Sequence, residues 1–209
     1  MSQPPADTAP ADSAPRTHRR ARRPAAQVRR EVLAAAGHLL LTEGMRAFTI
    51  ERVAAESATS KATIYKWWPS RGALALDGYF HAVEATLAFP DTGDITADLT
   101  AQIRALVHLL TTTPAGRVVA ELLGAAQTDP DLATAFRTLY SGPRRALAVQ
   151  ALDRARARGQ LREDLDAEAV VDQLGGAVYY RLLSRDQPLT DLFARTIVTQ
   201  LVEGLQRRR

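Results

Sequence analysis

The sequence predicts an all-α protein with an N-terminal three-helix head that contains a helix-turn-helix, followed by a larger helical body. Apolar residues recur at helical spacing along most of the chain, and no hairpin dipeptide joins two alternating β-branched runs. Two very short helical segments follow one another between residues 50 and 68. The 209 residues, 46% of them hydrophobic, are sufficient for one compact domain or for a small head joined to a larger body.

The composition excludes several classes of site. The chain has no cysteine, which rules out disulfides, thiolate metal sites and cysteine nucleophiles. No apolar run approaches the roughly 20 residues that a membrane span requires. The first 25 residues are rich in Pro, Ala and Arg and lack the apolar stretch of a secretory signal. We therefore expect a cytoplasmic protein with no membrane partner.

Positive charge is concentrated in the N-terminal third. Between Arg16 and Asp77 there are twelve basic and five acidic residues, a local excess of +7, whereas the whole chain carries +4. This asymmetry indicates that one end of the molecule meets a polyanion. Residues 1–24 have too little apolar content to fold alone, so we predict a disordered basic arm that either contacts nucleic acid or stays solvated. Its arginines include Arg19, Arg20, Arg22 and Arg23.

The first two predicted helices belong to the head. The first begins near Ala26, has an apolar stripe that includes Val32 and Leu39, and ends before Gly44. Thr49 is placed as the N-cap of a second helix of about two turns, which has Glu51 in its first turn and ends at Ser57.

A third short helix follows after a tight turn. Ser60 is its predicted N-cap, and Pro69 ends it after Trp68. Ile64 and Trp68 lie one turn apart on the inward face, so we assign both to the core. The polar residues Lys61, Thr63 and Lys66 lie away from that face. Because a major groove admits one α-helix, such a pair of helices suits DNA recognition.

The remaining helices form the body. Ser70 caps a longer helix that runs to about Ala88. Further helices are predicted at about 95–112, 117–127, 131–141, 143–158, 167–184 and 190–206. Their boundaries are set by Pro114-Ala115-Gly116, Asp129-Pro130, Gly142-Pro143, Gly159 and Pro188, with Asp166 and Thr190 as caps of the last two.

The stretch FTIERVAAESATSKATIYKWWPSRGALALDGY resembles the N-terminal domain of TetR family transcriptional regulators. It has the Thr-Ile-x-x-Val-Ala start, Ser-Lys-Ala-Thr-Ile-Tyr, and Trp-Pro-Ser-Arg at the Phe/Trp-Pro-Ser-Lys position. The later segment PDTGDITADL resembles the body of one subgroup, with its PDTG-type linker. The resemblance implies a DNA-binding domain at 25–70 and a ligand-sensing and dimerisation domain at 71–209.

The resemblance also implies a set of DNA contacts. Lys61, Ala62 and Thr63 would face the groove, and Tyr65, Lys66 and Arg71 would contact phosphates. Thr49 and Thr59 would contribute from the preceding helix and turn, and the alternative for each residue is a solvated helix face. The set is Thr49, Thr59, Ser60, Lys61, Ala62, Thr63, Tyr65, Lys66 and Arg71.

Three positions depart from the family pattern. Thr59 replaces a common valine, which either loosens the turn or adds a polar contact. Ala58 replaces a common glycine, at a cost of about 1 kcal/mol if the turn needs a positive φ. Trp67 replaces a residue that is often polar, and either donates to a phosphate or packs against the head.

The last two predicted helices offer a dimer seam, as the resemblance implies, because each has apolar residues on two sides. The alternative is a monomer with an ordinary core. The predicted interface consists of Val171, Leu174, Val178, Phe193, Ile197, Leu201 and Leu205. Gly175 and Gly176 lie inside one of these helices, and we interpret them as sites of close packing or a kink in preference to a cavity wall.

The resemblance implies a repressor that leaves its operator when a small molecule binds the body; activation, or a regulator without an effector, remains an alternative. Six polar residues are candidates for the ligand cavity, with a surface or internally satisfied position as the alternative for each. They are Gln102, His108, Glu121, Gln127, Gln173 and Tyr179.

Two other classes of function were weighed. An enzyme is disfavoured because the four histidines are scattered, and because the chain has no Gly-rich phosphate loop and no Gly-x-Ser-x-Gly elbow. We therefore expect no catalytic residues, no metal and no cofactor. A helical protein-interaction module is the other alternative, although it leaves unexplained why basic and hydroxyl residues gather between Ser60 and Lys66.

Overall fold

The structure, a computed structural model, describes residues 23–205 and is helical without any strand over that range. The helices are α1 (Ala25–Glu43), α2 (Ile50–Glu56), α3 (Lys61–Trp67), α4 (Arg71–Val83), η1 (Glu84–Leu87), α5 (Ile95–Thr112), α6 (Ala115–Ala126), α7 (Pro130–Ala135), η2 (Phe136–Ser141), α8 (Gly142–Ala157), α9 (Ala167–Ser184) and α10 (Asp191–Leu205). The predicted arm up to residue 22, with Arg19, Arg20 and Arg22, and the side chain of Leu205 lie outside the described part.

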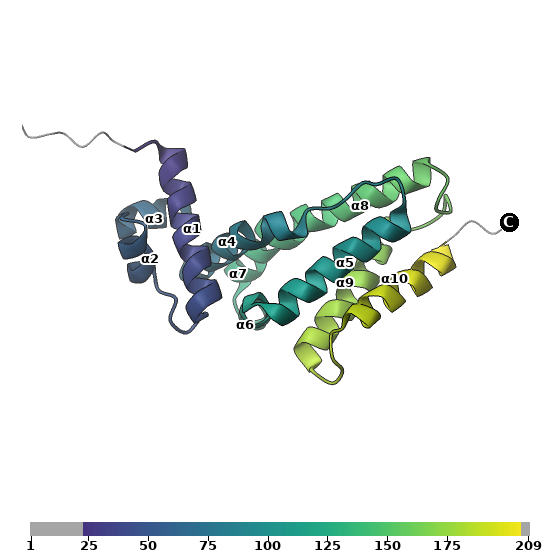
Figure 1. Cartoon of the computed structure of the whole chain (residues 1–209). Coiled ribbons are helices and arrows are strands. Elements are labelled where there is room, and N and C mark those ends of the chain that lie inside the picture. Colours follow the sequence, from purple (N-terminus) through teal and green to yellow (C-terminus); the bar gives the residue numbers. More distant parts are fainter. Residues whose placement is uncertain (1–22, 206–209) are drawn as a thin grey trace, which may run out of the picture.

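The molecule consists of a three-helix head and an elongated helical body, as the sequence predicts. Figure 1 shows α1, α2 and α3 grouped at one end, with α4 running from this head into the body. Helices α5 and α8 extend along the body, and α9 and α10 lie side by side along its lower flank in this view.

Local capping explains where the head helices begin. The side-chain oxygens of Thr49, Ser60 and Ser70 each accept a backbone N–H from the first turn of α2, α3 and α4. The donor–acceptor distances are 3.2 Å, 3.2 Å and 3.1 Å. These bonds satisfy amides that a helix start leaves free, so all three predicted caps are confirmed.

The head is attached to α4 by a close crossing of α1 and α4. A Cβ on Gly37 would lie 2.8 Å from both the Cβ of Ala82 and the carbonyl oxygen of Gly78, and a Cβ on Gly78 would lie 2.6 Å from that of Ala36. The two backbones therefore meet with no room for a side chain between them. Leu40, Leu74 and other fully buried side chains fill the space on either side of the crossing.

The body differs from the prediction at Gly142-Pro143. These residues were expected to separate two helices, but α7 continues through the π-helical segment η2 into α8 without a break. The amide of Gly142 donates to the carbonyl of Arg137, five residues earlier. A widened turn of this kind accommodates a proline, which lacks an N–H and would crowd the carbonyl four residues before it. The prediction of a boundary here was wrong, because the π turn relieves the conflict that normally ends a helix.

The last two helices begin at their predicted caps. The side chain of Asp166 accepts from the amide of Ala169 at 3.2 Å, and the hydroxyl of Thr190 accepts from the amide of Phe193 at 3.1 Å. Ala194, Val198 and Val202 of α10 are buried, and this helix packs mainly along α5.

Candidate functional site

The outer face of α3 presents a polar and basic surface. Lys61, Ala62, Tyr65 and Lys66 are all exposed, and they lie opposite the fully buried Ile64. Lys61 and Tyr65 are four residues apart, as are Ala62 and Lys66, so each pair is stacked one turn apart on the same side of the helix. Tyr65 is 51% exposed, which is unusual for a large aromatic side chain with no packing partner.

Lys61 has an acidic neighbour. Its Nζ lies 3.0 Å from Oε1 of Glu51 on α2, and both side chains are more than half exposed. Hydrogen bonds from the backbone and from Lys61 lower the pKa of Glu51, so this carboxylate is ionised at neutral pH. Because the pair is solvated, the lysine can exchange this partner for another anion at small cost.

Three of the predicted contact residues also hold the local fold. Thr49 caps α2, and Thr63 shares a hydrogen bond of 2.9 Å with the hydroxyl of Ser60. The hydroxyl of Thr59 donates to the carbonyl of Ser57 at 3.1 Å. All three threonines are half-buried, whereas Ser60 and Arg71, at the starts of α3 and α4, are fully or largely open to solvent. The nine predicted residues thus lie in one continuous region from the start of α2 to the start of α4.

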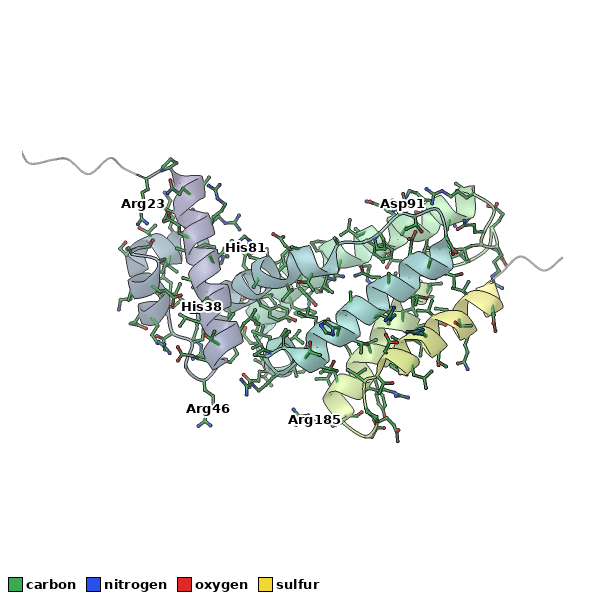
Figure 2. The ribbon with its side chains drawn as sticks, in the orientation of Figure 1. Arg23, His38, Arg46, His81, Asp91 and Arg185 are labelled. Atoms are coloured by element: carbon green, nitrogen blue, oxygen red, sulfur yellow. The ribbon has the colours of Figure 1, made fainter. Side chains whose placement is uncertain are left out.

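The turn between α2 and α3 has a positive φ at Ala58, the position where the family commonly has glycine. The φ of Ala58 is +47°. Arg23 covers this turn, since its guanidinium donates to the carbonyl of Ala58 at 2.6 Å and to that of Ser57 at 3.3 Å, and it also pairs with Glu31. Arg23 was expected in the basic arm, but here it binds the head itself, at the end of α1 nearest to α3 (Figure 2).

A buried carboxylate links α3 to α4 and α1. Oδ2 of Asp77 accepts from the indole N–H of Trp68 at 2.9 Å and from the guanidinium of Arg29 at 2.8 Å. Asp77 is 7% exposed and Trp68 only 2%. Arg29 also lies over the Trp68 ring, 5.6 Å from its centroid. The assignments of Ile64 and Trp68 to the core are confirmed, and Trp67 packs edge-on against Trp68. Sequence reasoning missed Asp77, although an acid within an apolar helical stripe is a detectable signal.

The body has a half-open cavity of about 380 Å³ between α5, α8 and α9, with η2 along one side. Its wall is mostly aliphatic and aromatic and includes Phe89, Phe136 and Leu174. The polar residues in the wall are Gln102, Tyr140, Ser141, Arg144, Arg145, Asp172 and Tyr179. The hydroxyls of Tyr140 and Tyr179 are 2.9 Å apart. Burial raises the pKa of Tyr179 well above its ordinary value, so its hydroxyl is protonated at neutral pH.

Comparison with known proteins identifies both parts of the chain. Residues 32–77 match the family described as bacterial regulatory proteins, tetR family, and residues 89–201 match the tetracyclin repressor-like C-terminal domain. The chain belongs to the TetR family. It is 37% identical to the HTH-type transcriptional regulator YdeS of Bacillus subtilis over 84% of this chain and 88% of that protein. It is also 29% identical to a protein of Mycobacteroides abscessus named DNA-binding transcriptional repressor TetR, over 82% of this chain and 90% of that protein.

A solved structure agrees with the fold. The crystal structure of the TetR family transcription regulator SCO0332 shares 62% sequence identity and superposes with a TM-score of 0.82, covering 87% of this chain and all of that one. The family and its relatives establish this TetR family member as a DNA-binding transcriptional regulator with an all-α fold, as predicted.

The cavity of this TetR family member contains two of the six predicted ligand candidates. Gln102 and Tyr179 both line it, whereas Glu121, Gln127 and Gln173 are exposed outside it. His108 is also exposed and lines a separate depression beside Asp191. Arg144 and Tyr140 were missed because they lie where the sequence suggested a helix boundary, next to Gly142-Pro143.

Gly175 and Gly176 do not mark a close approach to another helix of the same chain. A Cβ on either glycine would meet nothing within 4 Å, and both residues line the cavity. They leave space in the wall where any other residue would place a side chain.

The predicted dimer residues of this regulator are divided between two environments. Leu174 and Val178 are buried in the chain's own core, so they are not on a surface that a second copy can reach. Val171, Phe193, Ile197 and Leu201 are partly exposed. Further large apolar side chains are exposed nearby on α9 and α10; they are Tyr180, Leu183 and Leu192.

Among residues 23–205, no three His, Cys, Asp or Glu side chains are grouped as a metal site would require. No helix of the same described part has the length and apolar character needed to cross a bilayer.

Proposed function

We propose that this TetR family member is a repressor that binds its operator as a homodimer and leaves it when a small molecule occupies the body. The observation that carries this proposal is that one chain combines the exposed basic face of α3 with a mostly apolar cavity about 380 Å³ in volume. A ligand that favours one spacing of the two heads shifts the DNA affinity by its difference in affinity for the two states.

The DNA-binding domain in this proposal is formed by residues 25–70. Lys61, Ala62 and Thr63 face the bases at the start of α3, where side chains of a recognition helix reach the groove. Tyr65 and Lys66 contact phosphates, as does Arg71 at the start of α4. Thr49, Thr59 and Ser60 add hydroxyl contacts and, through the caps described above, keep α2 and α3 in register.

Residues 71–209 form the sensing and dimerisation domain. The half-exposed apolar residues of α9 and α10 support a four-helix interface between two copies, which brings two heads to half-sites about 34–36 Å apart. Repression is supported by the relative named as a repressor, and it needs only that the operator be occupied. As a bacterial DNA-bound regulator, the protein acts in the cytoplasm.

Sequence-specific DNA binding is tested by fluorescence anisotropy. The labelled DNA fragments come from upstream of the protein's own and neighbouring genes. We expect one fragment to bind at least about a hundredfold more tightly than unrelated DNA. Lys66→Ala, which removes a phosphate contact, should weaken this binding and reduce the slope of log affinity against log salt by about 0.9. Tyr65→Phe should weaken it without changing the slope.

Arg46→Ala is the matched control for the loss of one head cation. Arg46 extends from the α1–α2 loop, at the opposite end of the head from Arg23 (Figure 2). It should leave specific binding unchanged. Equal and steeply salt-dependent binding to every fragment would contradict sequence reading by the α3 face, and no binding at low salt by a folded dimer would favour the protein-interaction module instead.

A further inference from the structure

One guanidinium in the cavity wall has only neutral partners. Arg144 is half-buried, and its guanidinium donates to the carbonyl oxygen of Leu87 at 3.3 Å. The amide of Gln102 satisfies its neighbours when its oxygen accepts from Arg144 at 2.5 Å and its nitrogen donates to the carbonyl of Ala88 at 3.1 Å. No carboxylate of residues 23–205 is within ion-pair distance of Arg144. Glu84 and Arg144 both line a second depression beside η1, but the carboxylate of Glu84 pairs with His81.

The adjacent arginine shows the contrast. Arg145 also lines the cavity, but its guanidinium pairs with both Glu168 and Asp172 of α9. These two carboxylates raise the pKa of Arg145 by direct hydrogen bonds. Arg145, Glu168 and Asp172 together carry a net charge of −1, and because both carboxylates bind Arg145, the guanidinium of Arg144 has no ion-pair partner of its own.

Tyr140 and Tyr179 add hydroxyls to the same cavity wall as Arg144, and the charge of Arg144 acts on the hydroxyl of Tyr179. The two hydroxyls share one hydrogen bond, so the proton of one is used, and the proton of the other can turn to a ligand or to the neighbouring hydroxyl of Tyr79. A guanidinium has five N–H donors, and the two neutral partners of Arg144 use two of them. The wall thus has donors left for an anion.

The rest of the cavity favours a ligand with an apolar, ring-containing skeleton. Four aromatic side chains line it, Phe89, Phe136, Tyr140 and Tyr179, together with the leucines and valines of α5, α8 and α9. The open space at Gly175 gives a flat group room against the α9 backbone. Aromatic walls of this kind pack against planar rings at little cost in conformational entropy.

We propose that the cavity binds a small molecule with an apolar, ring-containing body and one anionic group, which Arg144 holds with help from Tyr140 and Tyr179. This inference rests on the proposed function, because it names the chemical class of the effector. A half-buried charge without an ion-pair partner is only partly solvated, and an anionic ligand that pairs with it is bound more tightly than its neutral counterpart.

Two fluorescent probes with the same ring skeleton, one charged and one neutral, test the preference of the cavity for an anionic ligand. Anilinonaphthalene sulfonate (ANS) carries one sulfonate, and N-phenylnaphthylamine (NPN) is the same molecule without it. Both are titrated into the full chain, and the ratio of their Kd values is measured. In Arg144→Gln the preference for ANS should fall by about tenfold, because one charge-assisted hydrogen bond is lost, while NPN binding stays within about twofold.

Two further variants keep the result interpretable. Arg144→Lys retains the charge and should keep most of the preference for ANS. Gly175→Leu fills the open space, favours the helix and should abolish binding of both probes, which shows that they occupy this cavity and not an exposed apolar surface. The inference is overturned if neither probe binds the wild-type protein, or if the ratio in Arg144→Gln stays within about twofold of the wild-type ratio.

The failure of this inference is distinguishable from that of the proposed function. In one outcome, Arg144→Gln loses the preference for ANS, but neither ANS nor any carboxylic acid in a ligand screen changes the DNA affinity. The proposal of a ligand-responsive repressor is then wrong, and the anion site is retained. If a neutral compound in the cavity releases DNA and Arg144→Gln responds equally, the repressor stands and the anion site fails.

Discussion

The α2–α3 turn places an alanine in a backbone conformation that favours glycine. Because Ala58 has φ +47°, its Cβ crowds the following carbonyl, and Ala58→Gly should raise the free energy of unfolding by about 1 kcal/mol. Urea denaturation checks this. Ala55→Gly, three residues earlier in helical backbone, is the control and should lower it by about 0.5–1 kcal/mol. Destabilisation by both substitutions would mean that the turn is not strained.

Tyr79 has a buried hydroxyl that makes no hydrogen bond of normal geometry among the described residues, although it lies beside the hydroxyl of Tyr140. Tyr79→Phe removes an unsatisfied polar group and should stabilise the fold by about 1 kcal/mol at neutral pH. Burial also raises the pKa of Tyr79. Above about pH 10 the unfolded chain ionises this tyrosine while the folded chain does not, so wild-type stability falls and the advantage of the variant grows.

The control for Tyr79 is Tyr65→Phe, on the exposed face of α3. It should change the free energy of unfolding by less than about 0.5 kcal/mol at neutral pH, and its difference from the wild type should not widen in alkali. If Tyr79→Phe is destabilising at neutral pH, its hydroxyl has a partner, such as an ordered water.

At the scale of helices, Asp77 of α4 accepts from Trp68 at the end of α3 and from Arg29 of α1, and so connects three helices. Asp77→Ala leaves the buried indole N–H of Trp68 unpaired and should lower the free energy of unfolding by about 3 kcal/mol. Asp77→Asn keeps an acceptor for Trp68 and should cost less. Urea denaturation followed by tryptophan fluorescence measures both, with Asp164→Ala, an exposed loop residue, as the control. Equal effects of Asp77→Ala and Asp164→Ala would contradict the structural role of this carboxylate.

Elements with local signals were predictable from sequence. The helix starts at Thr49, Ser60, Ser70, Asp166 and Thr190 depend on a side chain and an amide two or three residues away, so the sequence alone contains the whole interaction. The nine residues predicted to contact DNA form one region because their helices are consecutive.

The cavity was not predictable in the same way. It is formed where α5, α8 and α9 fail to fill the space between them, and no single helix records that. Gly142-Pro143 has the local signature of a helix end, yet tertiary packing holds a π turn there that brings Tyr140 and Arg144 to the wall. Of the predicted ligand residues, only Gln102 and Tyr179 line this cavity.

At the scale of the whole molecule, α10 separates its core contacts from its proposed dimer contacts. Ile197 lies about 100° around the helix from the buried Val198 and is partly exposed. Ile197→Glu should convert the dimer into a monomer in analytical ultracentrifugation and abolish specific DNA binding, since one head reaches only one half-site. Thr199→Glu adds the same charge about 200° away and should leave the dimer intact. A dimer that persists in Ile197→Glu would place the interface elsewhere.

The crossing of Gly37 and Gly78 has a mechanical consequence. Gly37 packs against Gly78 and Ala82, and Gly78 packs against Ala36, so closely that α1 and α4 have little room to slide over one another, and the head and α4 move as one rigid unit. Helix α4 is about 20 Å long, and a tilt of about 10° at its far end swings the head through about 3–4 Å. Two heads that swing in opposite directions change their separation by about twice that amount. The length of α4 thus amplifies a small tilt in the body into a displacement of α3 large enough to misalign it with the major groove.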